Sequence, residues 1–331
     1  MEGKLNISEK VVDDLTIRQR RNHILGICPV CGCRDANFNK VKGVWRCWHC
    51  PSSGFIVDEE GKSVYTVSEV ETPLFDIPEI RKLYSSLADK FHESLTSEAL
   101  TYLKGRGLTE DTINNFKLGF CSTDFYDEYS SGVAEDSGIV YQSYPVLSNR
   151  IIIPYFFENE VTDLRGRILD CITYKKNTPT YLSLAGNHKS RGAEFLFNHD
   201  IIGKSDRVII TEGEFKALLA IQYGFPIVAT PGVFAWNKEW SKLFKGKEVI
   251  LAADNENKSG LRSPAYLMTK LLKKEIPQLK VAVLFKTFKQ EKVDIDSLII
   301  NSGVKSFENA VDGAMDSTRW LWLQERKGYG G

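Results

Sequence analysis

The residues with the clearest chemistry are acids that follow apolar, strand-like runs. Glu212 comes directly after residues 208–211, and Asp254 and Glu256 come after the run 249–253. Neighbouring strands of an open parallel sheet form their ligand crevice at their carboxyl ends, so we expect these carboxylates to converge. Oxygen-only acid clusters suit Mg²⁺ or Mn²⁺. Such a site can clamp the attacking and leaving oxygens of a phosphoryl transfer, which predicts nucleotide chemistry.

Further charged residues lie close to these acids in the sequence. Asp294 and Asp296 follow another strand-like segment, and they are either additional metal ligands or the cap of a helix. Gly213 permits a sharp turn after Glu212, and a helix is expected to follow. On that helix, Glu214 and Lys216 either face solvent or take part in the site.

Basic residues upstream could neutralise a triphosphate or follow a template strand. Residues 150–157 and 161–169 read as a hairpin with a polar turn. Arginine is well suited to phosphate because its guanidinium forms paired hydrogen bonds with two oxygens. No phosphate-binding loop of the G-x-x-x-x-G-K-S/T type occurs. The candidates for template or triphosphate binding are Arg150, Arg165, Arg167, Lys189 and Arg191.

A cluster of cysteines lies near the beginning of the chain. Two C-x-x-C pairs, Cys28 with Cys31 and Cys47 with Cys50, are separated by fifteen residues. This spacing predicts one structural Zn²⁺ held by four thiolates, with no open position for water. Cys33 and His49 are spare residues that we expect not to be ligands. Aromatic and basic residues around the pairs could hold single-stranded nucleic acid, with half of the rings expected to fill the small core: Phe38, Lys40, Lys42, Trp45, Arg46, Trp48 and Phe55.

Composition restricts the class of protein. The 331 residues are 42% hydrophobic, which is ample for a globular core, and the formal net charge is zero. Any nucleic-acid surface must therefore be a local basic patch. No run approaches the roughly 18 apolar residues needed to cross a membrane, and residues 1–6 are too polar for a secretory signal. We therefore expect no membrane partner and a cytoplasmic location, the host cytoplasm if the protein is viral.

Patterning predicts an α/β protein with several parts. We expect a metal-binding ribbon over 1–58, in which a basic helix-like stretch at 15–23 precedes the cysteines, and a linker over 59–78. A helical and basic-strand α+β subdomain over 79–200 follows, with a helix over 79–104. Strands and helices then alternate over 201–300, which predicts a parallel sheet flanked by helices, and 301–331 form a helical tail segment. The expected elements are strands 207–211, 226–229, 248–253 and 280–285, and helices 214–223, 236–244 and 263–276.

Several stretches resemble the DnaG-type and phage-type DNA primases. Residues 102–109 with 116–120 resemble the start of the family's polymerase domain, residues 150–155 and 164–168 resemble its basic strand pair, and residues 179–183 resemble its downstream motif. Residues 211–213 and 254–256, with Gly260, resemble the metal site of the Toprim fold. The chain departs from the family pattern at Lys216, where an acid is common, at Glu256 in place of aspartate, and at Thr180, where a lysine is common.

The resemblance implies a primase, a nucleotidyltransferase and DNA-directed RNA polymerase that makes short RNA primers during DNA replication. It implies a single-stranded DNA template, ribonucleoside triphosphates and, as in a primosome, a replicative helicase in trans. Glu212, Asp254 and Glu256 would hold catalytic Mg²⁺ or Mn²⁺, and the zinc ribbon would help to select the start site. Two alternatives stay open: a Toprim-type metal-dependent nuclease, and a non-catalytic zinc-ribbon DNA-binding factor of replication or recombination.

Overall fold

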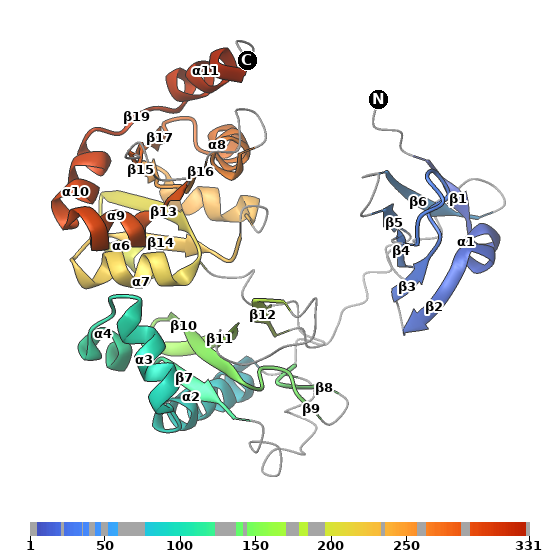
Figure 1. The fold of residues 1–331 in the computed structure, drawn as a ribbon, viewed down its shortest axis with the longest axis horizontal. Coiled ribbons are helices and arrows are strands. Elements are labelled where there is room, and N and C mark those ends of the chain that lie inside the picture. The colour runs from blue at the N-terminus through green and yellow to red at the C-terminus, as the bar shows by residue number, and fades with distance from the viewer. Residues whose placement is uncertain are drawn as a thin grey trace. The chain divides into compact units, whose positions relative to one another are not determined.

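The structure is a computed structural model of the chain, which divides into two compact units, Met1–Thr72 and Pro73–Gly331 (Figure 1). The described residues are 5–20, 23–34, 36–39, 44–47, 52–58, 77–122, 137–141, 144–169, 179–184, 196–232, 236–256, 263–285 and 292–328. The linker expected over 59–78 lies outside the described residues except for its last two positions.

The N-terminal unit is built on one sheet with the strand order β1-β6-β5-β4-β3-β2. Strands β2 to β6 pair antiparallel in sequence, and β1 pairs parallel with β6. Its elements are β1 (Ile7–Ser8), α1 (Glu9–Leu15), β2 (Thr16–Arg20), β3 (His23–Gly26), β4 (Ala36–Asn39), β5 (Val44–Cys47) and β6 (Ser53–Val57). The prediction of a helix over 15–23 is wrong. Helix α1 ends at Leu15 because Thr16 adopts an extended conformation, and the basic residues that follow form a hairpin in which Arg20 pairs with His23.

The core of this unit lies on one face of the sheet. Phe38 and Trp45 are buried side by side on β4 and β5, with ring centroids 6.1 Å apart. The indole Nε1 of Trp45 donates a hydrogen bond of 2.8 Å to the carbonyl of Leu5. A Cβ at Gly54 would overlap this same carbonyl group, so glycine lets the N-terminal segment pass close to β6. These two rings therefore fill the core and are not exposed to nucleic acid.

The second unit begins with helices packed on an antiparallel sheet of order β12-β11-β10-β7. Its elements are α2 (Ile77–Glu93), α3 (Ser97–Gly105), α4 (Glu110–Asn115), β7 (Gly119–Cys121), β10 (Arg150–Phe157), β11 (Glu160–Ile168) and β12 (Tyr181–Ser183), with a separate pair β8 (Val140–Tyr141) and β9 (Tyr144–Pro145). The helix expected over 79–104 is two helices, because the side chain of Thr96 accepts a hydrogen bond from the amide of Ala99 and starts α3. The predicted hairpin is confirmed, with Glu158 and Asn159 at positive φ in its turn.

A five-stranded sheet of order β14-β13-β15-β17-β19 follows. The first four strands are parallel, and β19 pairs antiparallel with β17. The strands of this sheet are β13 (Arg207–Glu212), β14 (Ile227–Thr230), β15 (Glu248–Leu251), β17 (Lys280–Val281) and β19 (Met315–Asp316). The helices of this part of the chain are α6 (Ile201–Lys204), α7 (Glu214–Gln222), the 3-10 helix η3 (Lys238–Phe244), α8 (Pro264–Glu275), α9 (Ile295–Ser302), α10 (Val304–Asp312) and α11 (Ser317–Gly328). The expected α-helix at 236–244 is thus a 3-10 helix, and the expected strand 280–285 is only two residues long.

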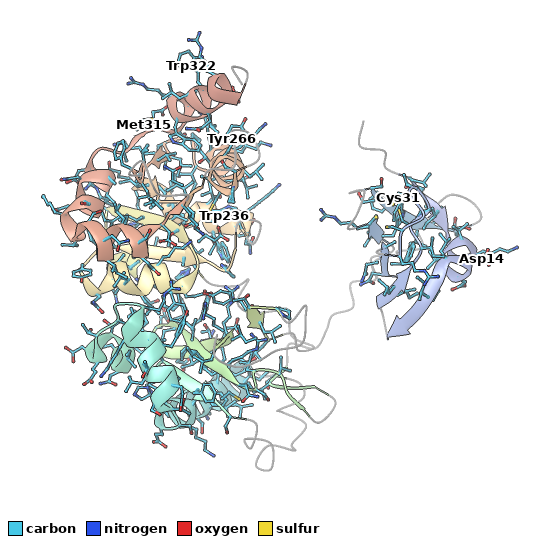
Figure 2. The ribbon with its side chains drawn as sticks, viewed as in Figure 1. Asp14, Cys31, Trp236, Tyr266, Met315 and Trp322 are labelled. Carbon is cyan, nitrogen blue, oxygen red and sulfur yellow. The ribbon has the colours of Figure 1, made fainter. Side chains whose placement is uncertain are left out.

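Alternate residues of the strands enter two different cores. Ile209 and Ile250 belong to the cluster that contains residues of α7, α9 and α10. Val208 and Val249 belong to the cluster that contains residues of η3 and α8. Trp236 packs on this second side, with its ring centroid 5.5 Å from that of Trp240 (Figure 2). Because side chains alternate across a strand, this division means that helices cover both faces of the sheet, as the predicted α/β class requires.

The helical part is joined to the parallel sheet by polar contacts. The side-chain oxygen of Gln222, at the end of α7, accepts a hydrogen bond of 2.7 Å from the amide of Thr109. Its nitrogen donates to the carbonyl of Gly107 at 3.1 Å. Gly107 itself has φ +82°, a conformation that L side chains rarely adopt. The turn between α3 and α4 is thereby fixed against the helix that follows Glu212.

Candidate active site and cysteine cluster

Glu212 and Asp254 lie at the same edge of the parallel sheet. β13 and β15 pair with Ile210 opposite Leu251, and the hydroxyl of Thr211 donates a 2.9 Å hydrogen bond to the carbonyl of Ala252. Glu212 ends β13, and Gly213, with φ +86°, turns the chain into α7. Asp254 follows β15 three residues after its last position. The carboxyl ends of the two strands therefore deliver these acids to one edge, as the sequence predicts.

A short strand pair brings the later acids to this edge. β16 (Asn255–Glu256) pairs antiparallel with β18 (Lys292–Val293), with Asn255 opposite Val293. In that register Asp254 and Asp294 flank the same end of the pair. The side chain of Glu256 lies outside the described part of the structure, so its predicted role as a ligand stays a prediction.

Asp254 is buried between two ammonium groups. Its side chain is 7% exposed. Its Oδ1 lies 2.5 Å from Nζ of Lys216, and its Oδ2 lies 2.6 Å from Nζ of Lys292. Lys216 is four residues after Glu212, one turn into α7, so its presence at the acids has a signal in the sequence. Lys292 reaches the acids only because β16 pairs with β18.

Asp294 is the N-cap of α9. Its carboxylate accepts a 2.9 Å hydrogen bond from the amide of Ser297, whose hydroxyl accepts one from the amide of Asp294. Burial acts to raise the pKa of Asp294, but hydrogen bonds from Ser297 and the charges of Lys216 and Lys292 outweigh it, and the pKa is lowered. The capping alternative is therefore confirmed, while a role as metal ligand stays a prediction.

Asp296 forms an ion pair with Arg106, which follows α3. The Asp296 side chain is 10% exposed, and its Oδ1 has no hydrogen-bond partner among the described residues. Burial raises its pKa despite the neighbouring charge of Arg106. The pair thus neutralises the acid next to Asp294 and links it to the helical part. Sequence patterning gave no sign of this contact, because it joins residues 190 positions apart.

The carboxylates suit a hard divalent cation by their chemistry, since every donor is an oxygen. Among the described side chains, however, no three acidic residues bring one carboxylate oxygen each within 4.8 Å of one another; that distance is met by three cysteines alone. The acids share one edge of the sheet, and the ammonium groups of Lys216 and Lys292 lie on the carboxylate that would be central to a metal site.

The arginines of the predicted basic hairpin are buried. Arg150 donates to the carbonyls of Pro179 and Thr180 at 2.9 and 3.0 Å. Arg165 is ion-paired with Glu214 and donates to the carbonyl of Pro231 at 2.7 Å. These contacts hold β10, β11 and α7 in place.

Arg167, the third arginine of this hairpin, lies over aromatic rings. The guanidinium of Arg167 lies over the rings of Tyr102 and Tyr181, 4.6 and 5.8 Å from their centroids, and Arg167 is 9% exposed. Lys189 and Arg191 lie outside the described residues. Template or triphosphate binding by Arg167, Lys189 and Arg191 therefore stays a prediction.

Glu214 is completely buried, so neither a solvated position nor free acid chemistry describes it. The hydroxyl of Tyr155 donates a 2.5 Å hydrogen bond to its Oε1, which also pairs with Arg165. Burial, and then the charge of Glu214, raise the pKa of Tyr155 well above its usual value, so the phenol remains a donor. This three-residue group connects the antiparallel sheet to the start of the helix that carries Lys216.

Three cysteines of the predicted zinc site come together. The Sγ atoms of Cys28, Cys31 and Cys47 lie within 4.8 Å of one another, and these sulfurs could hold a metal ion. Cys50 lies outside the described residues. Cys33, expected to be a spare residue, has its Sγ 3.3 Å from that of Cys47. Soft sulfur donors in this number suit Zn²⁺.

The outer face of the N-terminal sheet is exposed. Leu25 pairs with Asn37, Asn37 with Arg46, and Arg46 with Ser53, so these residues share one face with Phe55. Phe55 is 44% exposed and Leu25 is 40% exposed. Of the rings and cations predicted to hold nucleic acid, Phe55 and Arg46 are the described ones that remain at the surface.

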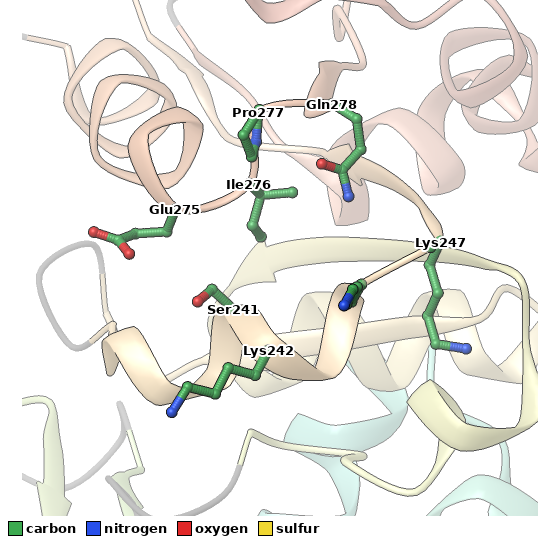
Figure 3. A pocket seen from close by; sticks show the side chains of 9 residues that line it. Ser241, Lys242, Lys247, Glu275, Ile276, Pro277 and Gln278 are labelled. Atoms are coloured by element: carbon green, nitrogen blue, oxygen red, sulfur yellow. The ribbon is translucent and has the colours of Figure 1, made fainter.

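A separate cavity of about 580 Å³ lies at the opposite edge of the parallel sheet (Figure 3). It is lined by Lys242, Lys245 and Lys247 ahead of β15, and by Glu275 to Gln278 ahead of β17. The amino ends of parallel strands lie away from the carboxyl ends, so this cavity is not part of the acid site.

None of the helices in the described part of the chain has the length and apolar character needed to span a bilayer.

The comparisons with known proteins agree with this layout. No protein-family model matches the chain. The DNA primase of Rickettsia prowazekii (strain Madrid E) is 23% identical over 377 residues, covering 99% of this chain and 61% of that protein. The DNA primase of Helicobacter pylori (strain J99) is 26% identical over 342 residues, covering 92% and 59%. The chain thus spans about three fifths of the length of these relatives.

Solved structures share the fold. The zinc-binding and RNA polymerase domains of the Aquifex aeolicus primase match 96% of this chain and 87% of that one, with a TM-score of 0.59 and 16% identity. The RNA polymerase domain of Mycobacterium tuberculosis DnaG matches 74% and 86%, with a TM-score of 0.62 and 17% identity. The chain is therefore a relative of the DnaG-type DNA primases and has the fold of their zinc-binding and RNA polymerase domains.

Proposed function

We propose that the chain is a DNA primase, which synthesises short RNA primers on a single-stranded DNA template by nucleotidyl transfer. The proposal rests on the placement of Glu212 and Asp254 after neighbouring parallel strands, at the same carboxyl edge of the sheet, in a chain with the primase polymerase fold. Single-stranded DNA is supported as template because a similar DnaG catalytic domain, 20% identical with a TM-score of 0.60, is bound to it. Ribonucleoside triphosphates and a helicase in trans complete the proposed partners.

The acids at the sheet edge define where the reaction takes place. Glu212, Asp254 and Glu256 would hold Mg²⁺ or Mn²⁺, with Asp294 close to Asp254 across the β16–β18 pair. Such an ion lowers the pKa of an attacking hydroxyl and neutralises a triphosphate. The residues of the chain orient this site: the Thr211 hydroxyl fixes β13 against β15, and Gly213 turns the helix away after Glu212. Attack in line by the primer 3′-hydroxyl would release pyrophosphate.

Basic residues would then place the template and the triphosphate. Lys292 is half exposed beside Asp254, so it can reach a phosphate at the edge of the site. Arg167, Lys189 and Arg191 would bind the template or the triphosphate. Arg150 and Arg165 we assign to positioning the strands, because their guanidinium groups are occupied by Pro179, Thr180 and Glu214.

The N-terminal unit would hold one structural Zn²⁺ through Cys28, Cys31, Cys47 and Cys50. The ion would fix the loops that precede β4 and follow β5, and so hold in place the strands that present Arg46 and Phe55. Cations follow phosphates, and exposed rings stack on unpaired bases. We assign template recognition to this outer face.

The deciding experiment is a primer-synthesis assay with a mixed-sequence single-stranded template, Mg²⁺ and labelled ribonucleotides. The wild-type chain should synthesise labelled RNA, and this synthesis should require both the template and all four ribonucleotides. Asp254→Ala should abolish synthesis while DNA binding, measured by fluorescence anisotropy, remains. An active Asp254→Ala variant would remove the acid from its role. Nicking of plasmid DNA without nucleotides would instead identify a nuclease, and binding without either activity would identify a DNA-binding factor.

A further inference from the structure

Lys216 has a position that is electrostatically costly unless acids surround it. It is the third residue of α7, within the first turn, where the helix dipole favours negative groups and disfavours an ammonium. Its side chain is only 13% exposed, so its charge is also largely removed from water. Both costs are offset by the carboxylate of Asp254, at 2.5 Å. The charge of Lys216 also interacts favourably with Asp294 and Asp296.

The backbone that carries Lys216 cannot readily move away. Its neighbours Phe215 and Ala217 are 2% and 0% exposed and belong to the main core. The preceding residue, Glu214, is held by Arg165 and Tyr155. Withdrawal of the ammonium from Asp254 would therefore have to come from the side chain alone, and it would leave a buried carboxylate oxygen without its partner.

Lys292 also forms an ion pair with Asp254, but its side chain is far more exposed than that of Lys216. Its side chain is 46% exposed, and it lies on the two-residue strand β18. An exposed lysine loses little when it turns from a carboxylate to water. The two oxygens of Asp254 thus have unequal partners: Oδ2 is held by a lysine that can leave, and Oδ1 by a lysine that is fixed in the protein.

Two-metal sites for phosphoryl transfer place their ions about 3.5–4 Å apart, so that they share a carboxylate. An ammonium at hydrogen-bond distance from Oδ1 of Asp254 takes a position on that oxygen that an ion would need, and it supplies one positive charge there. We propose that Lys216 takes the place of one divalent ion, so that the acid site binds a single exchangeable ion, on the Oδ2 side of Asp254, in the absence of nucleotide. This inference rests on the proposed function for the identity of the site, but it concerns how many ions the protein itself holds.

The test counts bound Mn²⁺ by electron paramagnetic resonance on the zinc-loaded full chain without nucleotide. The wild type is expected to bind one Mn²⁺ per chain. Lys216→Asp, which replaces the ammonium by a further carboxylate, is expected to bind two. Lys216→Gln, which removes the charge and shortens the side chain by one atom without adding a carboxylate, is the milder variant and is expected to admit a second, weaker ion. Circular dichroism and zinc content establish that each variant is folded.

Lys292→Met is the matched control, since it removes the other ammonium on Asp254. It is expected to keep a stoichiometry of one Mn²⁺ per chain and to bind that ion severalfold more tightly, because the lysine no longer competes for Oδ2. Two ions in the wild type, or a single ion in both folded Lys216 variants, would overturn the role of Lys216. Primer synthesis by a wild type that binds two ions would leave the proposed function standing, whereas loss of synthesis in Asp254→Ala tests that function separately.

Discussion

The guanidinium of Arg165 on β11 forms a buried ion pair with Glu214 at the start of α7, with side chains 9% and 0% exposed. This contact links the antiparallel sheet to the helix that carries Lys216, immediately after Glu212. An arginine on a strand of the basic hairpin is thus a structural partner of an acid on the helix that follows β13. The geometry of the acid edge depends on this pair because a displaced α7 would move Lys216 relative to Glu212, which ends β13 and is held in the sheet.

We expect Arg165→Met to destabilise the second unit by about 3–5 kcal/mol, because removal of one partner leaves a buried, uncompensated charge on Glu214. The double variant Arg165→Met, Glu214→Gln should recover part of this loss. Urea unfolding followed by fluorescence gives the free energies. The exposed pair of Arg81 and Glu160, whose side chains are 25% and 57% exposed, is the control, and Glu160→Gln should cost about 0–1 kcal/mol. Equal losses in the two single variants would contradict the burial argument.

Asp294 should contribute to stability through its cap. Asp294→Ala should cost about 1 kcal/mol, because the amide of Ser297 loses its acceptor, while Asp294→Asn should cost less because the amide oxygen can still accept. Thermal unfolding at neutral pH compares the three proteins. An alanine variant as stable as the wild type would show that the capping hydrogen bond has no net value.

The advantage of the Asp294 carboxylate over the side-chain amide of the Asp294→Asn variant should depend on pH. The folded-state pKa of Asp294 is lowered from an ordinary value of 3.8, so its ionised form is favoured in the folded chain. The resulting stability is present above that ordinary pKa and is lost as the pH falls through the lowered one. The difference in stability between wild type and Asp294→Asn should therefore shrink as the pH is taken below about 4. A difference that grows on acidification would have the wrong sign.

Zinc removal should affect the N-terminal unit alone. Cys47→Ser, or treatment with a strong chelator, should release one Zn²⁺ per chain and lower the melting temperature of that unit, because its small core is stabilised by the metal. Zinc released to a chromogenic chelator and two-step melting curves provide the measurement. Cys121→Ser, at a buried cysteine of the second unit, is the control and should keep the zinc. Cys33→Ser should also retain it if Cys50 completes the site.

Template binding should depend on the outer face of the N-terminal sheet. Phe55→Ala should weaken single-stranded DNA binding by about 1–3 kcal/mol through lost stacking, and Arg46→Ala should reduce the salt dependence of binding by about one unit of slope. Fluorescence anisotropy at several salt concentrations measures both. Lys10→Ala, an exposed cation on α1, is the charge-matched control and should bind as the wild type does. Unchanged affinity in both face variants would move template recognition to the second unit.

Much of the fold followed from local pattern. Alternation of apolar runs and helical stretches after residue 201 predicts a parallel sheet with helices on both faces, and the division of Ile209 and Val208 between two cores confirms it. Cysteine spacing predicts the sulfur cluster, and the helix expected over 263–276 is α8, which begins at Pro264. These features depend on residues close together in the chain, whose conformational preferences can be judged without knowing the rest of the structure.

The partners of the charged residues were decided by the tertiary structure. Arg165 has the same sequence appearance as a phosphate-binding arginine, but it is buried on Glu214 because β11 packs against α7. Lys292 reaches Asp254 only through the pairing of β16 with β18. A sequence specifies which charges exist and which strand ends carry them. Which charge lies opposite which depends on packing between segments far apart in the chain, and that packing placed the ammonium groups of Lys216 and Lys292 on the two oxygens of Asp254.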